Sequence, residues 1–182
     1  MIAVAIIGAG PLGRWLALSA ARAGFRVLLE DVMPTNLHHA REALRVELGA
    51  DALPNVTFVS TIEDAVREAD LAIDCVPDEL ESKLEIFCLL DRMAPPRTVL
   101  ATPTTRLSIA DLAACTYRAG KCIAIAAEAS SLAANAGSEI LLRTTSKTTA
   151  ETVALLEDFW RRLGYIPNFE ADTAEAIVGQ TI

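Results

Sequence analysis

Short apolar runs alternate with longer segments whose apolar residues recur at helical spacing, along almost the whole chain. The runs are rich in β-branched residues and mostly uninterrupted by polar positions, which is typical of strands buried on both faces of a sheet. We expect strands at residues 2–7, 25–31, 56–60, 71–76, 95–101, 121–127 and 139–143, and a short extended piece at 165–170. We expect helices at residues 14–24, 33–50, 61–70, 79–93, 108–116 and 148–164.

Buried strands separated by helices of about a dozen residues predict βαβ units and therefore parallel strand pairing. The expected fold class is α/β: a Rossmann-type, doubly wound, mostly parallel sheet with helices on both faces. No linker-like stretch and no internal repeat interrupts the pattern, so residues 1–182 are expected to form one dinucleotide-binding domain.

Composition excludes several classes of function. Hydrophobic residues make up 52% of the chain and charged residues 22%, which indicates a globular protein. The net charge of -8 argues against a nucleic-acid partner, because binding to phosphate backbones needs a basic surface. The first apolar run is short and lacks a preceding cationic segment, so neither a signal peptide nor a membrane span is expected, and we predict a cytoplasmic protein. The four cysteines form no CxxC pair, which favours reduced, mostly buried thiols and no metal site.

A G-x-G-x-x-G motif, formed by Gly8, Gly10 and Gly13, joins the first expected strand to the first helix. At this junction the first glycine permits a tight turn, the second lets the backbone approach a pyrophosphate, and the third lets helix and strand pack closely. The helix N-terminus then points its amides at the anion. A purely structural glycine turn, or a related domain that holds FAD or S-adenosylmethionine, remains an alternative.

Asp31 ends the second expected strand, where a carboxylate can accept hydrogen bonds from the adenosine ribose hydroxyls and repel a 2′-phosphate. The predicted cofactor is therefore NAD rather than NADP. Arg14, beside the glycine turn, leaves an opening for NADP.

Three segments together resemble the NAD-binding domain of the 3-hydroxyacyl-CoA dehydrogenases. They are "IIGAGPLGRWLALSAARAGFRVLLED", "ADLAIDCVPDELESKLEIFCLLDRMAPPRTVLATPTTRLSIADLA" and "TSKTTAETVALLEDFWRRLGYIP". The specific part is the middle segment, with its V-P-acid run, E-x-K-x-x-I-F, L-D-x-x-A-P-P and L-A-T. The resemblance implies an NAD-dependent oxidoreductase of fatty acid metabolism that transfers hydride between NAD and a 3-hydroxyacyl substrate of the CoA type.

The resemblance also implies roles for individual residues. Asp78 corresponds to an acid near the nicotinamide ribose, and Lys83 to a lysine close to cofactor and substrate, although a solvated helix lysine is an alternative. The family's serine that contacts the substrate appears here as Thr105, between Pro103 and Arg106. The predicted cofactor-binding residues are Gly8, Gly10, Pro11, Leu12, Gly13, Asp31, Val76, Pro77, Asp78, Lys83 and Thr102.

The chain departs from the family where the catalytic base is expected. Family members end the sixth strand with H-F-F-N-P, whose histidine takes the hydroxyl proton, whereas this chain has Ala126 at the histidine and Ala129 at the asparagine. The glutamate that supports the histidine corresponds to Glu139, one residue out of register, or Glu139 is simply a carboxylate at the start of an edge strand. Glu128 is close enough in sequence to replace the base only if burial raises its pKa. With Thr105, these two glutamates are the candidate catalytic residues.

Two further features bear on function. His38 and His39, the only histidines, fall in the helix after the second strand and are expected to be a solvated pair far from the nicotinamide. The family's C-terminal helical domain is absent from these residues, so either the protein is the nucleotide domain alone or the chain ends near a domain boundary. The exposed loop at 130–137 and tail at 174–182 then predict a homo-oligomer. The alternative function is a non-catalytic NAD(H)-binding subunit or sensor.

Overall fold

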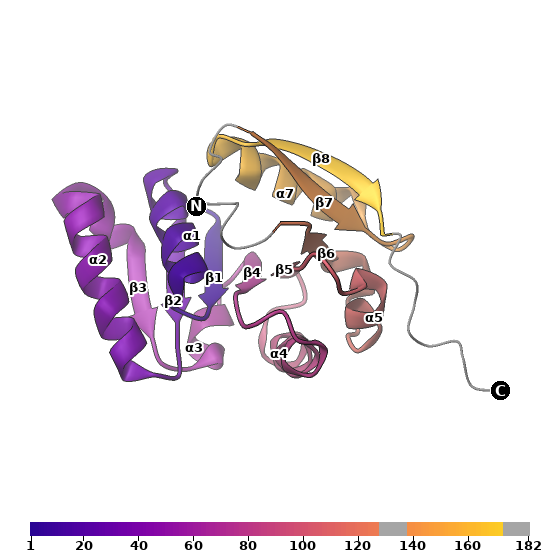
Figure 1. Cartoon of the computed structure of the whole chain (residues 1–182), viewed down its shortest axis with the longest axis horizontal. Coiled ribbons are helices and arrows are strands. Elements are labelled where there is room, and N and C mark those ends of the chain that lie inside the picture. The colour runs from indigo at the N-terminus through magenta and orange to yellow at the C-terminus, as the bar shows by residue number, and fades with distance from the viewer. Residues whose placement is uncertain (128–137, 173–182) are drawn as a thin grey trace.

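The computed structural model describes residues 1–127 and 138–172, and these residues form one sheet with helices on both faces (Figure 1). The strands are β1 (Ala3–Ile7), β2 (Arg26–Glu30), β3 (Val56–Val59), β4 (Leu71–Asp74), β5 (Val99–Pro103), β6 (Cys122–Ile125), β7 (Glu139–Thr144) and β8 (Ile166–Ala171). The helices are α1 (Pro11–Arg22), α2 (Pro34–Ala52), α3 (Ile62–Val66), α4 (Leu80–Met93), α5 (Ile109–Ala114) and α7 (Ala150–Arg162), with short 3₁₀ turns at Leu53–Asn55 and Ala119–Lys121.

The strand order in the described sheet is β3-β2-β1-β4-β5-β6-β7-β8, and every pair is parallel except β6 with β7. The predicted α/β class with a mostly parallel, doubly wound sheet is therefore confirmed. The segment at 165–170, expected only as an extended piece, is the strand β8 at the edge of the sheet. As a result β7 lies between two strands, and the expectation that Glu139 begins an edge strand is wrong.

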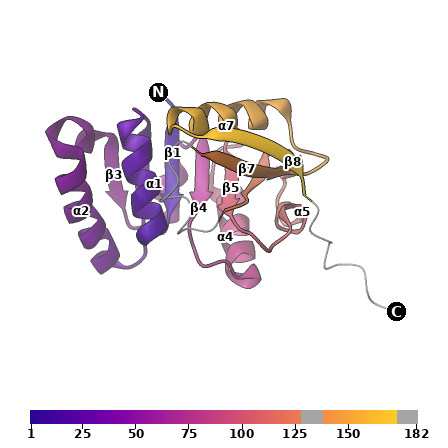
Figure 2. The same ribbon diagram turned by 45° about the horizontal axis from the view of Figure 1, so that its top comes forward.

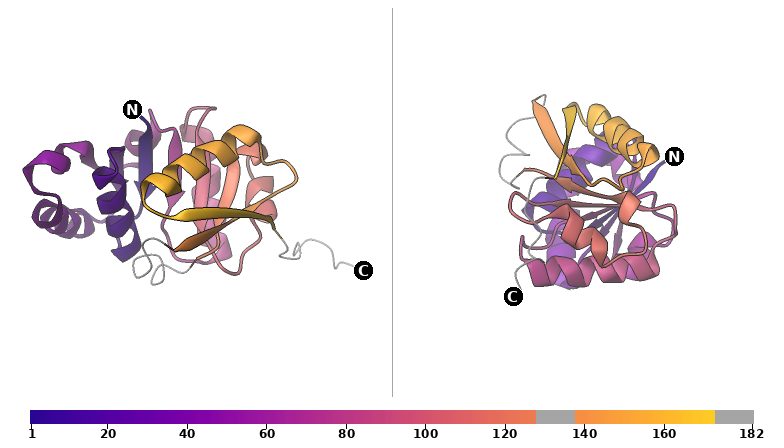
Figure 3. Two further views of the ribbon diagram at one scale, coloured as in Figure 1. Left: turned by 90° about the horizontal axis from the view of Figure 1, so that it is seen from above. Right: turned by 90° about the vertical axis from the view of Figure 1, so that its right-hand side faces the viewer.

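Two layers of helices enclose the sheet, as the end-on view in Figure 3 shows. One layer contains α1, α2 and α7, whose apolar residues pack with alternate residues of the strands in one cluster. The other contains α3, α4 and α5, which pack on the opposite face in a second cluster. Figure 2 shows α7 and α4 on the two sides of the central strands. The continuous apolar runs of the sequence follow from this arrangement, because β1, β4 and β6 are buried on both faces.

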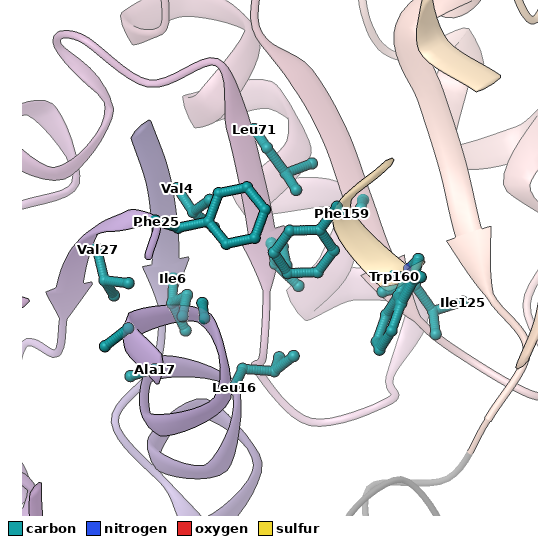
Figure 4. Packing of buried hydrophobic residues seen from close by; sticks show 14 of the residues in the cluster. Val4, Ile6, Leu16, Ala17, Phe25, Val27, Leu71, Ile125, Phe159 and Trp160 are labelled. Atoms are coloured by element: carbon teal, nitrogen blue, oxygen red, sulfur yellow. The ribbon is translucent and has the colours of Figure 1, made fainter. Parts of the chain in front are cut away.

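Aromatic side chains link the two ends of the first layer. Phe159 from α7 lies with Phe25, which precedes β2, near Val4 and Leu71, and Trp160 lies beside Ile125 (Figure 4). The ring centroids of Phe25 and Phe159 are 5.2 Å apart. Because such pairs bury large apolar areas, they fix α7 against the strands that carry the glycine turn.

Helix starts follow the capping residues of the sequence. Thr61, Ser108 and Thr149 each accept a hydrogen bond from a backbone N–H in the first turn of α3, α5 and α7. The helix α1 instead begins with a proline after Gly10, and no side chain caps it. Its N-terminal amides therefore remain available to an anion.

Candidate functional site

The glycine turn after β1 has the geometry that an anion-binding turn requires. Gly8 has φ +104°, a conformation that side-chain-bearing residues rarely adopt, and its N–H donates to the Glu30 carbonyl oxygen at 2.9 Å. A Cβ on Gly13 would lie only 1.8 Å from the carbonyl oxygen of Gly8, so α1 packs directly against the turn. A Cβ on Gly10 would meet nothing within 4 Å, and the space above the turn is open for a ligand.

A cavity of about 860 Å³ lies in front of this turn. It follows the carboxyl ends of β1, β2, β4 and β5, where β1 has β2 on one side and β4 on the other. This is the point at which doubly wound sheets bind ligands. The predicted residues in its wall are Gly8, Gly10, Pro11, Leu12, Asp31, Val76, Pro77, Asp78 and Thr105.

Asp31 follows β2 and is held firmly at the edge of the cavity. Its Oδ2 accepts from the Ala9 N–H at 2.8 Å and from the Asn36 amide at 3.1 Å. Its Oδ1 accepts from the Met33 N–H at 2.8 Å. These donors fix the carboxylate next to the glycine turn, with the remaining lone pairs available to the hydroxyls of a ligand.

Glu30 is a cavity residue that we did not expect from the sequence. It is 5% exposed, and burial, with a smaller contribution from the charge of Asp31, raises the pKa of its carboxyl to about 7. The sequence contains a signal for this buried acid, because Glu30 ends β2 directly before Asp31, and side chains of adjacent residues in extended backbone point in opposite directions.

Lys83 and Thr102, which we predicted to bind the cofactor, are buried and contact each other. The Lys83 ammonium donates to Thr102 Oγ1 at 2.8 Å and to Asp74 Oδ2 at 3.3 Å, and all three side chains are buried. Neither Lys83 nor Thr102 lines the cavity. The Lys83 ammonium compensates a buried carboxyl, and contact of Lys83 or Thr102 with a cofactor stays a prediction. Asp74 Oδ1 in turn accepts from the Val76 N–H at 2.9 Å and so shapes the loop after β4.

Asp78 and Arg106 lie together at the mouth of the cavity. The Arg106 guanidinium donates to the Asp78 carbonyl oxygen at 2.8 Å, and its Nε lies 3.9 Å from the carboxylate. Asp78 Oδ1 is buried and has no hydrogen-bonding partner among the described residues. The Thr104 hydroxyl accepts from the N–H groups of Arg106 and Leu107, and this turn holds Thr105 at the cavity wall.

The end of β6 brings no acid or base into the described part of the cavity. Ala126 donates its N–H to the Leu141 carbonyl oxygen, and Ala127 lines the wall. Glu139 is exposed at the start of β7 and does not line the cavity. Glu128, Ala129 and the loop to residue 137 lie outside the described residues, as does the tail from residue 173.

Other candidate residues lie away from this site. His38 and His39 are exposed on α2, as expected. The four cysteines are free thiols, and burial raises the pKa of the Cys75 thiol at the cavity wall. The described ranges contain no group of three or more histidine, cysteine or acidic side chains arranged for a metal ion. No helix within them has the length and apolar character needed to cross a bilayer.

Comparison with known proteins gives a consistent set of similarities. The family model for the NAD-binding domain of 3-hydroxyacyl-CoA dehydrogenase matches residues 3–168. A probable 3-hydroxybutyryl-CoA dehydrogenase of Bacillus subtilis is 33% identical over 128 residues, which cover 63% of this chain and 44% of that protein. The 5-formyl-3-hydroxy-2-methylpyridine 4-carboxylate 5-dehydrogenase of Mesorhizobium japonicum is 32% identical over 121 residues, covering 61% of this chain and 39% of that protein.

A solved structure of a diketoreductase, described as acting on dicarbonyl compounds, superimposes with a TM-score of 0.83 at 26% identity. The superposition covers 98% of this chain and 67% of the diketoreductase. The stretches matched by sequence cover less than half of either curated relative. The names of these relatives indicate different substrates. The similarity therefore supports a shared nucleotide-binding domain rather than one particular reaction.

Proposed function

The chain belongs to the 3-hydroxyacyl-CoA dehydrogenase family, because it matches the NAD-binding domain of that family. On this basis we propose that residues 1–182 form one domain that binds NAD(H). The observation that carries the proposal is the open space above Gly10, between a free helix N-terminus and the fixed carboxylate of Asp31. A dinucleotide needs these two features together, because its pyrophosphate and its adenosine ribose are adjacent.

Each part of the cofactor has a matching group in this proposal. The amides at the start of α1 bind the pyrophosphate, and Asp31 accepts from the adenosine ribose hydroxyls. The unpartnered Oδ1 of Asp78 accepts from the nicotinamide ribose. The bound NAD(H) supplies the hydride chemistry, while the chain orients the cofactor and excludes a 2′-phosphate at Asp31. NAD is therefore preferred over NADP.

Calorimetric titration tests this binding. We expect NAD(H) to bind at low-micromolar to sub-millimolar concentration, and Asp31→Ala to weaken NAD and reduce the preference over NADP. Asp31→Asn removes the negative charge but keeps an oxygen that can accept from the Ala9 N–H. It therefore separates the effect of the charge from the effect of losing this hydrogen bond to the glycine turn. Asp158→Ala, on the surface of α7, is the matched control and should bind as the unmodified chain does. Equal affinity of the unmodified chain for NAD and NADP contradicts the assignment.

The reaction that family membership supports is hydride transfer between NAD and a 3-hydroxyacyl substrate of the CoA type. Thr105 and the anchored Arg106 are the groups at the cavity mouth that a substrate would meet. The matched stretches cover less than half of these relatives, whose remaining residues have no counterpart in the match. We therefore propose the full dehydrogenase activity only for a protein that also has residues closing the substrate site.

A second candidate function, a non-catalytic NAD(H)-binding subunit or sensor, is favoured by one observation. Alanine occupies position 126, where the family has its catalytic histidine, and Glu139 is exposed outside the cavity. Loss of a general base lowers a rate by about 10² to 10⁴. A chain with this β6 end can keep cofactor affinity and still turn over slowly.

Incubation with NADH and acetoacetyl-CoA, followed by absorbance, separates the two candidates. We expect background rates for the unmodified chain. Turnover in the ordinary range of about 1 to 10³ per second, abolished by Glu128→Gln or Glu139→Gln, would show that a carboxylate has replaced the histidine and would support the enzyme. Equal background rates in all three proteins support the binding subunit.

Self-association is the remaining part of the proposal. The tail and the loop at 130–137 carry small and apolar residues, which favours contact with a second copy over exposure to water. Light scattering is expected to give at least twice the mass of 19.4 kDa. A monomer at high protein concentration contradicts this expectation.

A further inference from the structure

The carboxyl group of Glu30 lies in the cavity wall and has no hydrogen-bonding or ion-pair partner in the described part of the chain. Its backbone pairs with Ile7 and Val59 in the sheet, and its carbonyl oxygen accepts from the Gly8 N–H at the glycine turn. The residue is 5% exposed. The Glu30 oxygens are not among the fully buried side-chain atoms that lack a partner, so the carboxyl faces the open space of the cavity, where a ligand can contact it.

The elements packed against β2 bring no cation to Glu30. Leu28 packs with α3 in the second core cluster, and alternation along the strand places Glu30 on the same face. The neighbouring strands β1 and β3 contain no ionisable residue. On α3, the acids Glu63 and Asp64 are exposed and both lie within ion-pair distance of Arg67.

The remaining cations near the site are on other elements or already paired. Arg14 and Arg22 belong to α1, which packs on the opposite face of the sheet. Arg106, at the cavity mouth, is held by Asp78. Lys83 is enclosed by its own buried partners and does not line the cavity. The charged group that acts on Glu30 is therefore another acid, Asp31.

We propose that Glu30 is a proton-carrying determinant of cofactor affinity: the dinucleotide binds the form of the chain in which the Glu30 carboxyl is neutral, and above neutral pH binding takes up a proton there. This inference rests on the proposed function, that the cavity holds NAD(H). Asp31 already places a negative charge beside Glu30, and the two phosphates of the dinucleotide add more negative charge to the cavity. An ionised Glu30 would therefore oppose binding by charge repulsion.

A neutral carboxyl also gains a hydrogen-bonding role. It presents one O–H donor and one carbonyl acceptor, which is the pair of groups an amide side chain uses against the edge of an adenine. Asp31, beside Glu30 on the chain, is the proposed ribose ligand, so the base attached to that ribose lies at this end of the cavity. Glu30 is thus a specificity residue for the adenosine end rather than a catalytic residue.

Proton uptake can be counted directly by titrating NAD calorimetrically in buffers of different ionisation enthalpy. If binding raises the Glu30 pKa by about one pH unit from about 7, the unmodified chain takes up about half a proton at about pH 7.5. The dissociation constant should then rise about five- to tenfold between about pH 6 and pH 9. Glu30→Gln should take up no proton and bind with an affinity that is constant across this range.

The matched control is Glu85→Gln, which removes one negative charge from the exposed face of α4 without touching the cavity. It should keep the proton uptake of the unmodified chain. Zero uptake in the unmodified chain, a measurement that needs no variant to fold, would overturn the proposal, as would unchanged uptake in Glu30→Gln. If NAD binds at no pH, the proposed function itself is refuted, and this result is distinct from pH-independent binding, which refutes only the role of Glu30.

Discussion

Gly13→Ala is expected to destabilise the fold far more than an ordinary glycine substitution in a helix. The added Cβ would lie 1.8 Å from the Gly8 carbonyl oxygen and 3.0 Å from the Gly8 carbonyl carbon. Both are backbone atoms, so no side chain can rotate away, and α1 must move by about 1 Å or more to restore ordinary contact distances. That movement would disturb Leu16 and Ala17, which are fully buried against the sheet.

The magnitude follows from two opposing effects. Alanine is favoured over glycine in a helix by about 1 kcal/mol, whereas overpacking costs about 1–3 kcal/mol and occasionally more, and for a clash this close with backbone atoms we take about 4 kcal/mol. We expect a net loss of about 3 kcal/mol. For a chain of this size, each kcal/mol lowers the Tm by about 2–4 °C, so the Tm should fall by about 6–12 °C.

Gly10→Ala supplies the contrasting variant in the same turn. A Cβ at Gly10 meets no atom within 4 Å, and its φ of -67° is one that alanine adopts freely. The substitution at this N-cap position should cost less than about 1 kcal/mol. Because the new methyl group enters the space left for the pyrophosphate, NAD affinity should fall at least about tenfold.

Thermal melts followed by circular dichroism and NAD titrations by calorimetry measure both effects. A Gly13→Ala variant that melts within about 2 °C of the unmodified chain would refute the clash argument. Unchanged NAD affinity in a stable Gly10→Ala variant would refute the location of the pyrophosphate.

Three further changes should alter stability. Burial raises the pKa of Glu30 from an ordinary 4.5 to about 7, so its ionisation destabilises the fold above pH 7, by at most about 3 kcal/mol because solvent in the cavity screens the charge, and not below pH 4.5. Glu30→Gln should therefore raise the Tm at about pH 8 and leave it unchanged at about pH 4.5. Lys83→Met leaves the Asp74 carboxyl buried without its cation, and denaturant unfolding should show a loss of about 3–5 kcal/mol. Asp172 accepts from the Ser108 hydroxyl and from two N–H groups at the start of α5, so Asp172→Ala should cost about 1–2 kcal/mol by the same measurement.

The fold could be predicted from the sequence because most strands are buried on both faces. A strand such as β1 or β6 must then be apolar at every position, and it contrasts sharply with the amphipathic helices on either side. The strand β8 shows the opposite case. It is half exposed, contains a proline and a glutamate, and lies at the edge of the sheet, so its sequence resembles an extended loop.

Site residues could be predicted from the sequence where the backbone geometry requires a particular residue type. They were harder to predict where a side chain can pair with more than one partner. Gly8 and Gly13 are required by a positive φ and a close approach, and neither requirement depends on distant residues. Lys83 is different, because a lysine on a helix reaches outward to solvent or inward to a buried acid with the same local sequence. The partner that decides, Asp74, belongs to the preceding strand, and its burial is known only once the sheet is assembled.

The two ends of the cavity are defined to different degrees, and this bears on whether the chain catalyses. At the proposed adenosine end Asp31 is held by three hydrogen bonds, and the space above the turn beside it is open. At the other end Asp78 and the anchored Arg106 offer binding groups, but the end of β6 contributes only an alanine, Ala127, to the cavity wall among the described residues. In the proposed function the first end holds the cofactor, whereas proton transfer requires a group within hydrogen-bonding reach at the second. Tight NAD binding by this chain is therefore no measure of its turnover, and only a rate measured with a carbonyl substrate distinguishes an altered enzyme from a binding subunit.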